Sequence, residues 1–145
     1  MATVNIDPVY SKAGSVSNNA ATAMNQLITL AANDYTGAGA NNSLVFTADA
    51  TNGSFVQRLR FKAGGTNVAS VMRIFINNGT TVGTAANNVF YGEISLPATT
   101  AIATAATVEL DYPLGFALPA AFRIYVGLGT AVAAGWVCTA VAGNY

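Results

Sequence analysis

Hydrophobic and polar side chains alternate strictly in two neighbouring stretches near the middle of the chain, residues 54–63 and 69–77. Alternation with a period of two is typical of a β-strand that buries one face. A segment rich in Gly, Thr and Asn separates the two stretches, and these residues favour turns. The pattern therefore predicts two strands, and it assigns these side chains to the core: Phe55, Leu59, Phe61, Met72, Ile74 and Ile76.

The same alternation continues along most of the chain after residue 25. Asn-Gly pairs and segments rich in Gly or Asn interrupt it at nearly regular spacing, which is typical of β-sandwiches and barrels. No stretch after Asn33 keeps a helical period long enough for a helix of several turns. We predict an all-β fold, an eight-stranded antiparallel sandwich with strands at residues 26–32, 43–49, 54–63, 69–77, 88–96, 107–113, 121–128 and 135–143.

The first 24 residues follow neither period for long and are rich in Asn, Ser, Ala and Thr. A short helix over residues 20–30 is the alternative, but Thr and Asn disfavour it. We predict an extended N-terminal arm over residues 1–24, followed by one sandwich domain over residues 25–145. Apolar side chains of this arm favour contact with a partner surface over water, and the candidates are Val4, Ile6, Val9 and Tyr10.

The distribution of charges indicates the topology. In the jelly-roll order, the strands at 54–63 and 107–113 are neighbours in one sheet, and those at 69–77 and 88–96 are neighbours in the other. Opposite charges that face each other across strands contribute a few tenths to about 1 kcal/mol each. We predict jelly-roll topology because it brings opposite charges together: Arg58, Arg60 and Lys62 with Glu109 and Asp111, and Arg73 with Glu93. The alternative is that these positions are only solvated outward faces.

The surface must be unusually poor in charge. Only 8% of the residues are charged, and six basic residues balance six acidic ones, whereas soluble domains carry about a quarter charged residues. Such a surface meets little electrostatic resistance to self-association or to docking on a neighbour. Without a basic excess, nucleic acid is not expected as a partner.

Few residues could support catalysis or bind a metal. The chain has no His and a single Cys, Cys138, so the commonest general base and metal ligand is missing and no intrachain disulfide can form. The only close pair of carboxylates, Glu109 and Asp111, is predicted on one outward face. The Gly-rich stretches lack the Lys and the helix of a phosphate-binding loop. We predict that the protein is not an enzyme and needs no cofactor or metal.

No long uninterrupted apolar run is present, and the N-terminus lacks a basic head followed by an apolar core. We therefore expect no membrane segment and synthesis in the cytoplasm.

One outward sheet face collects apolar and aromatic side chains, including Val45, from four predicted strands. An apolar strip is costly to leave in water, and aromatic residues with Arg are enriched at interface centres. We predict that this strip contacts another subunit through Val71, Arg73, Phe75, Tyr91, Arg123 and Tyr125.

Short sequence phrases across residues 44–145 resemble small structural proteins of tailed bacteriophages. They are Leu44-Val-Phe-Thr-Ala48, Asn52-Gly-Ser-Phe-Val-Gln-Arg-Leu-Arg60, Gly65-Thr-Asn-Val-Ala-Ser-Val-Met-Arg-Ile-Phe-Ile-Asn-Asn-Gly79, Glu93-Ile-Ser-Leu-Pro-Ala-Thr-Thr100, Leu118-Pro-Ala-Ala-Phe-Arg-Ile124 and Gly129-Thr-Ala-Val-Ala-Ala-Gly-Trp136.

The resemblance implies a capsid decoration, or cement, protein: a single jelly roll on the outside of a phage head that clamps neighbouring major capsid subunits. It implies a homo-oligomer, with a trimer expected and a dimer as the alternative, located on the virion exterior and made in the host cytoplasm. The runner-up is a receptor- or glycan-binding head or tail module of the virion, in which Tyr91, Tyr125 or loop residues would stack on sugar rings.

Overall fold

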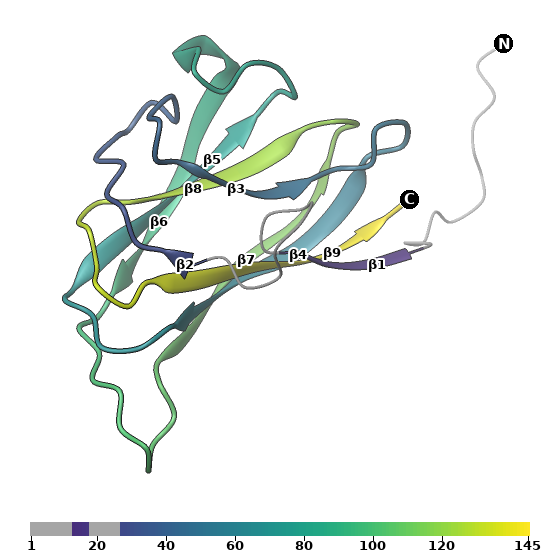
Figure 1. The fold of residues 1–145 in the computed structure, drawn as a ribbon. Helices are drawn as coiled ribbons and strands as arrows, with labels where there is room; N and C mark the ends of the chain where they lie inside the picture. The colour runs from purple at the N-terminus through teal and green to yellow at the C-terminus, as the bar shows by residue number, and fades with distance from the viewer. Residues whose placement is uncertain (1–12, 18–26) are drawn as a thin grey trace, which may run out of the picture.

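The chain forms two antiparallel β-sheets that pack face to face in a computed structural model, which describes residues 13–17 and 27–145 (Figure 1). The prediction of an all-β antiparallel sandwich is confirmed. The strands are β1 (Ala13–Ser17), β2 (Leu27–Ile28), β3 (Ser43–Thr47), β4 (Ser54–Ala63), β5 (Ser70–Asn77), β6 (Asn88–Leu96), β7 (Glu109–Leu118), β8 (Arg123–Leu128) and β9 (Trp136–Asn144). A single turn of 3-10 helix, η1 (Ala85–Asn87), precedes β6.

The first sheet has the order β1-β9-β4-β7, and β2 also pairs with β9. Both β1 and β2 lie on the side of β9 away from β4, because β4 pairs along nearly the whole length of β9. The second sheet has the order β3-β8-β5-β6. Strands that are distant in sequence are thus neighbours in each sheet, and both chain-end strands β1 and β9 lie in the first sheet (Figure 1).

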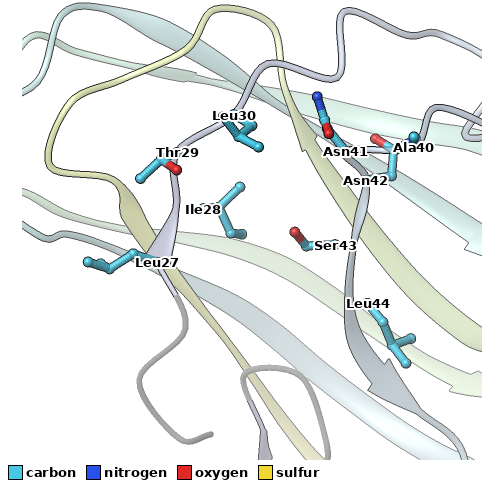
Figure 2. A pocket seen from close by; sticks show the side chains of 9 residues that line it. All are labelled: Leu27, Ile28, Thr29, Leu30, Ala40, Asn41, Asn42, Ser43 and Leu44. Atoms are coloured by element: carbon cyan, nitrogen blue, oxygen red, sulfur yellow. The ribbon is translucent and has the colours of Figure 1, made fainter.

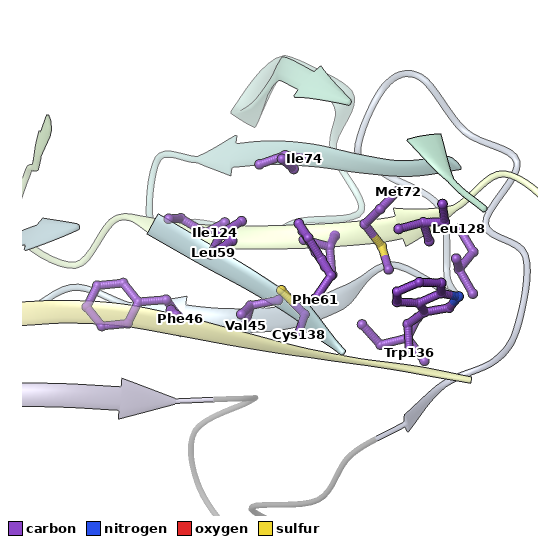
Figure 3. Packing of buried hydrophobic residues seen from close by; sticks show 14 of the residues in the cluster. Val45, Phe46, Leu59, Phe61, Met72, Ile74, Ile124, Leu128, Trp136 and Cys138 are labelled. Carbon is purple, nitrogen blue, oxygen red and sulfur yellow. The ribbon is translucent and has the colours of Figure 1, made fainter. Parts of the chain in front are cut away.

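The core lies between the sheets and takes side chains from both. Trp136, Phe61, Leu59, Met72 and Ile74 have essentially no exposed surface. Figure 3 shows Trp136 and Met72 toward one end of this cluster and Phe46 toward the other. Fully burying a side chain of this size contributes roughly 1.5–3 kcal/mol of transfer free energy, so packing of this core is a main source of stability.

The core prediction for β4 is wrong at its first half. Val56 is fully buried, whereas Phe55 is 37% exposed and Gln57 is exposed. The registers of β4 with both neighbours shift between Val56 and Arg58, so a β-bulge at Gln57 reverses the alternation that the sequence pattern carries. Beyond the bulge, Leu59 and Phe61 point inward as predicted.

Strand β7 is longer than predicted and runs through Pro113. Pro is compatible with an edge strand because its missing N–H can face away from the ladder, and β7 ends the sheet order. Gly115 follows with φ of +66° at the register shift opposite the β4 bulge. Strand β2 is shorter than predicted, since the chain leaves the first sheet after Ile28.

The predicted extended arm includes residues 13–17, but the structure places these residues in β1, which pairs with β9. Their sequence, Ala-Gly-Ser-Val-Ser, holds one large apolar residue, so no alternation marks them as a strand. The rest of the predicted arm, residues 1–12 and 18–24, lies outside the described residues.

A buried amide joins three loops at one end of the sandwich. The Asn67 Oδ1 atom accepts hydrogen bonds of 2.9 Å from the backbone N–H groups of Ala134 and Gly135, and its Nδ2 donates to the Gly135 carbonyl at 3.0 Å. The Asn67 backbone pairs with Thr99, whose hydroxyl donates to the Gly65 carbonyl at 2.6 Å. The loops before β5, after β6 and before β9 are therefore held together by Asn67.

The described residues contain no helix that is long and apolar enough to cross a membrane.

Candidate interaction surfaces

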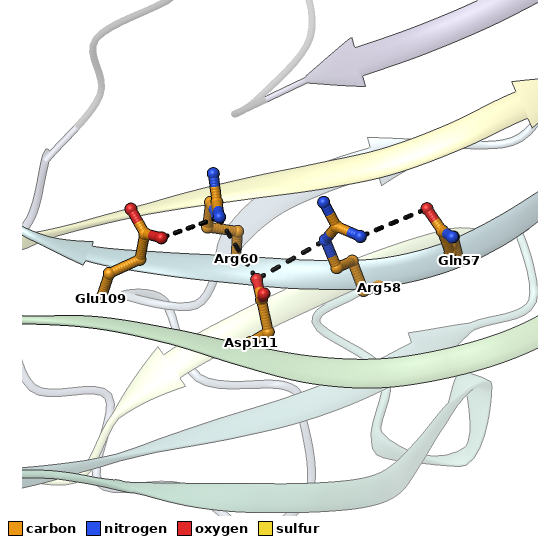
Figure 4. Close-up of polar contacts among 5 residues, drawn as sticks. All are labelled: Gln57, Arg58, Arg60, Glu109 and Asp111. Atoms are coloured by element: carbon orange, nitrogen blue, oxygen red, sulfur yellow. Dashed lines mark hydrogen bonds and ion pairs between the residues drawn. The ribbon is translucent and has the colours of Figure 1, made fainter.

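The outer face of the first sheet carries a row of paired charges on β4 and β7 (Figure 4). Arg60 lies opposite Asp111 in the register, and Lys62 lies opposite Glu109. Because these two strands are adjacent and antiparallel, the predicted facing of opposite charges is confirmed.

The ion pairs in this row are exposed, and only one of them is short. The Arg60 Nη2 atom lies 2.7 Å from Glu109 Oε1, and Arg60 Nε lies 3.4 Å from Asp111 Oδ1. Arg58 Nε approaches the same Asp111 oxygen at 3.6 Å. Lys62 instead donates a 2.8 Å hydrogen bond to the Thr107 carbonyl. The side chains in the three ion pairs are about 36–45% exposed, so each pair contributes little to stability, and the row chiefly neutralises this face.

The second predicted charge pair also forms, on the outer face of the second sheet. Arg73 of β5 lies opposite Glu93 of β6, with Arg73 Nε 3.6 Å from Glu93 Oε2. Only 7% of the Arg73 side chain is exposed, against 48% of the Glu93 side chain. Arg73 is therefore covered by another part of the chain.

Residues 29–42, which we call the cover segment, lie over this outer face. The Arg73 guanidinium stacks 3.9 Å from the centre of the Tyr35 ring, and its Nη2 donates to the Tyr35 hydroxyl at 2.8 Å. A Cβ atom at Gly37 would lie only 3.0 Å from the Phe75 ring. The φ of +77° at Gly37 also favours glycine. The segment thus fits closely against β5.

Asp34 fixes the shape of the cover segment. Its Oδ1 accepts hydrogen bonds from the Thr36 N–H and hydroxyl at 2.8 and 2.7 Å, and its Oδ2 accepts from the Gly39 N–H and the Asn42 amide at 2.8 and 2.9 Å. Partial burial raises the pKa of Asp34, but these hydrogen bonds together outweigh it and lower the pKa to about 2. The carboxylate is ionised at neutral pH and organises a tight loop.

The predicted exposed strip on this face is therefore wrong for four of its residues. Phe75 is fully buried, and Arg73 and Tyr125 are 6% and 8% exposed in the single chain. Phe75 and Tyr125 lie opposite each other in the β5–β8 register. Val45 is also buried, in the core rather than on the outer face.

The remaining predicted contact residues lie in different places. Val71 and Arg123 are half-buried, and Arg123 Nη1 donates to the Thr80 carbonyl at 3.4 Å. Tyr91 is 41% exposed, but it does not belong to the covered face. Val4, Ile6, Val9 and Tyr10 lie outside the described residues, and their role stays a prediction.

Tyr91 of β6 points toward β7, the last strand of the other sheet. The β5–β6 register skips Tyr91, since Ile74 pairs with Gly92 and Phe75 with Phe90. The Tyr91 ring lies 5.3 Å from the Phe116 ring and 6.5 Å from the Tyr112 ring of β7. Because of this bulge, Tyr91 packs in an aromatic cluster with Tyr112 and Phe116. Alternation in the sequence does not predict this position.

A pocket of about 330 Å³ lies between the start and the end of the cover segment, beside β2 and β3 (Figure 2). Its walls are formed by Leu27, Ile28, Thr29, Leu30, Ala40, Asn41, Asn42, Ser43 and Leu44. The lining has hydroxyl and amide groups but no ionisable side chain, so it offers no acid, base or anchor for an ion.

Within the described residues, no group of three or more His, Cys, Asp or Glu side chains is arranged to hold a metal ion. Burial raises the pKa of the Cys138 thiol well above its usual value, which keeps the thiol protonated and a poor nucleophile. Comparisons with protein-family models, with curated proteins and with solved structures find no match to this chain.

Proposed function

We propose that this protein is a capsid decoration protein of jelly-roll type. It binds the outside of a tailed-phage head, as a homo-oligomer, and stabilises contacts between major capsid subunits. The phage-like phrases in the sequence suggest the class, and three features of the structure support it.

The strand order supports the jelly roll. Apart from β1, the first sheet contains β2, β9, β4 and β7 in that order, and the second contains β3, β8, β5 and β6. From β2 onward, consecutive strands alternate between the sheets except for the β5–β6 pair, which is the order expected from the two Greek keys of a jelly roll. The crossing from β4 to β5 passes between layers through residues 64–69.

The observation that carries the proposal is the engagement of charge within the chain. The chain has twelve charged residues, and ten of them lie in the described part; Asp7 and Lys12 do not. Each of the ten makes an ion pair or hydrogen bond to another group of the same chain. The rest of the surface is built from Ala, Thr, Asn, Ser, Gly and scattered apolar residues. Such a surface can be buried against a neighbour with little cost of charge desolvation.

An uncharged loop offers a contact of this kind. The connection between β6 and β7 extends away from the sandwich (Figure 1). It carries Ile102, which is 56% exposed and forms a bridge with Ala105. Residues 97–106 contain no charge and expose several small apolar side chains, a composition suited to a weak apolar contact with a capsid subunit.

Clamping needs buried area rather than chemistry. A stable contact buries about 800 Å² per partner, and smaller contacts gain strength when several are made at once on a lattice. A decoration protein of this type therefore needs neither an enzyme site nor a cofactor.

The proposal is tested with purified protein and emptied heads of the phage that encodes it. Heads and protein are mixed, sedimented and analysed for bound protein, and head survival after heating or osmotic shock is counted. Saturable binding and greater survival are expected, and Ile102→Lys is expected to weaken binding. If the wild-type protein does not sediment with heads at any concentration, the proposal is wrong.

A glycan-binding module is the second candidate, because Tyr91 exposes an aromatic ring beside Tyr112 and Phe116. Aromatic rings can stack on sugars, and a glycan array with saturable hits that Tyr91→Ala abolishes would favour this role over capsid decoration.

A further inference from the structure

We propose that a second copy of this chain binds the open side of the sandwich, along β6 and β7. The inference rests on the proposed homo-oligomer, for which it names the surface.

Strands β6 and β7 are the last strands of their sheets and lie at the same side of the sandwich. In the described part of the chain, β6 pairs only with β5 and β7 only with β4. An edge strand of this length presents unpaired backbone donors and acceptors, which makes it a template for another chain. Contact between the two edges is direct, because a Cβ at Gly92 of β6 would overlap the Tyr112 hydroxyl of β7.

Apolar side chains line the space between the two edges. Val89 is 57% exposed and Tyr91 is 41% exposed, and three half-buried residues of β7 pack beside them against the core. We call this set the β6–β7 seam: Val89, Tyr91, Tyr112, Leu114 and Phe116. Exposed apolar residues that gather along an edge strand are unfavourable in water unless a partner covers them.

The seam is electrically neutral, which selects the kind of partner. Glu93 of β6 faces the outer side, where it pairs with Arg73. Glu109 and Asp111 of β7 face the outer side of the first sheet, where they pair with Arg60. Among the described residues of β6 and β7, no charged side chain is left to attract a charged partner into the seam, and another seam has the same neutral apolar character. A second copy is therefore complementary in charge and chemistry.

The size of the seam sets the strength of this contact. Strands of nine and ten residues are roughly 30 Å long, and packed sheets are about 10 Å apart. The open side then covers on the order of 300 Å² per copy, less than half of the roughly 800 Å² per partner that a standard stable contact buries. Association is expected to be weak in solution and to strengthen where a lattice holds two copies close together.

Two identical seams meet most simply around a two-fold axis, since the same residues face each other in an isologous contact. The inference therefore favours the dimer over the trimer as the species formed in solution.

The test is sedimentation-velocity analysis of the full chain over a wide concentration range, from micromolar to near-millimolar. Wild-type protein is expected to shift from monomer to dimer as concentration rises. Val89→Lys and Tyr91→Lys should each weaken dimer formation tenfold or more, because each places a charge in an apolar contact. Both positions are exposed, and circular dichroism with thermal unfolding verifies that each variant is folded.

Ile102→Lys is the matched control, because it introduces the same charge at an apolar side chain of similar exposure outside the seam. It should dimerise like the wild type while binding heads less well. Dimers that persist in both seam variants would overturn the seam but not the homo-oligomer. A trimer that neither variant affects would also overturn the seam, and would leave the homo-oligomer standing. Protein that stays monomeric yet binds heads would overturn the seam and the homo-oligomer, and leave capsid decoration standing. Loss of glycan-array binding in Tyr91→Lys without any change in association would assign the seam to a sugar.

Discussion

Arg73 of β5 holds Tyr35 of the cover segment in place, with its guanidinium carbon 3.9 Å from the centre of the Tyr35 ring and its Nη2 donating a 2.8 Å hydrogen bond to the Tyr35 hydroxyl. The same guanidinium lies 3.5 Å from the Asp34 carbonyl and pairs with Glu93. One buried cation thus connects two strands of the second sheet to the segment that covers them. Its partners are groups 38 and 39 residues earlier in the chain and a carboxylate on the neighbouring strand.

Replacing Arg73 should loosen the cover segment. Arg73→Ala removes the stacking, which is worth about 0.5–2 kcal/mol, and hydrogen bonds of a charged group, each worth about 1.5–3 kcal/mol. We expect the free energy of unfolding, measured in urea, to fall by about 2–4 kcal/mol. Amide exchange should accelerate in residues 29–42 more than in β4 or β9.

Tyr35→Phe is the control for this change, since it keeps the ring over Arg73 and removes only the hydroxyl. Its cost should be about 1 kcal/mol. An Arg73→Ala variant with wild-type exchange rates in residues 29–42 would contradict the role assigned to Arg73.

Acid should weaken the protein through Asp34. Its pKa in the folded chain is about 2, below the ordinary 3.8, so the ionised form is stabilised by folding. That contribution is complete above pH 4 and is lost as the pH falls toward 2. Because the carboxyl is only partly buried, solvent screening limits the contribution to about 1 kcal/mol.

The measurement is urea unfolding of the wild type and Asp34→Asn between pH 2 and pH 7. The variant should be less stable than the wild type at pH 7, and the difference should shrink below pH 4. Some acid sensitivity should remain in the variant, because the Asn52 and Thr51 amides also hold the pKa of Asp49 below its usual value. A stability difference that does not change with pH would contradict the assignment.

The ion pairs between β4 and β7 should contribute little to stability, because their side chains are exposed to solvent. In a double-mutant cycle of Arg60→Ala and Glu109→Ala, the coupling free energy should be about 0.2–1 kcal/mol. It should decrease in 1 M salt, which screens exposed charges over about 3 Å. A coupling free energy above about 2 kcal/mol, or one that salt leaves unchanged, would contradict this prediction. It would show that the pair is better shielded from solvent than its 42% side-chain exposure indicates.

How much the sequence reveals depends on whether the alternation is continuous. The ladder from Arg60 to Asp111 was predictable because opposite charges at alternate positions on two strands restrict which strands can be neighbours. Phe55 and Tyr91 were misplaced because each adjoins a bulge, and one extra residue moves the following side chains to the opposite face. Nothing in the local pattern of Gln57 or Tyr91 marks the insertion.

The burial of Phe75 was unpredictable for a different reason. The segment that covers it, residues 29–42, is mostly Gly, Ala, Asn and Thr and has neither period. Its position depends on long-range contacts of Tyr35 with Arg73 and of Gly37 with Phe75, which a reading of local periodicity does not include. The outer face of β5 therefore looked exposed in the sequence although the chain itself covers it.

Asn67 should be the most sensitive uncharged polar residue among those described at the loop end of the sandwich. It is 4% exposed, and its side chain satisfies two backbone N–H groups and one carbonyl of the loop before β9. Asn67→Ala leaves these buried groups unpaired, and each costs about 1–3 kcal/mol. We expect the free energy of unfolding to fall by about 3–5 kcal/mol, with a matching loss in thermal midpoint.

Asn41→Ala is the control, since exposed Asn41 makes a single 2.8 Å hydrogen bond to the Ala31 carbonyl and its replacement should cost less than about 1 kcal/mol. Equal stability of the two variants would mean that water replaces the Asn67 amide, and that the three loops are held by backbone contacts instead.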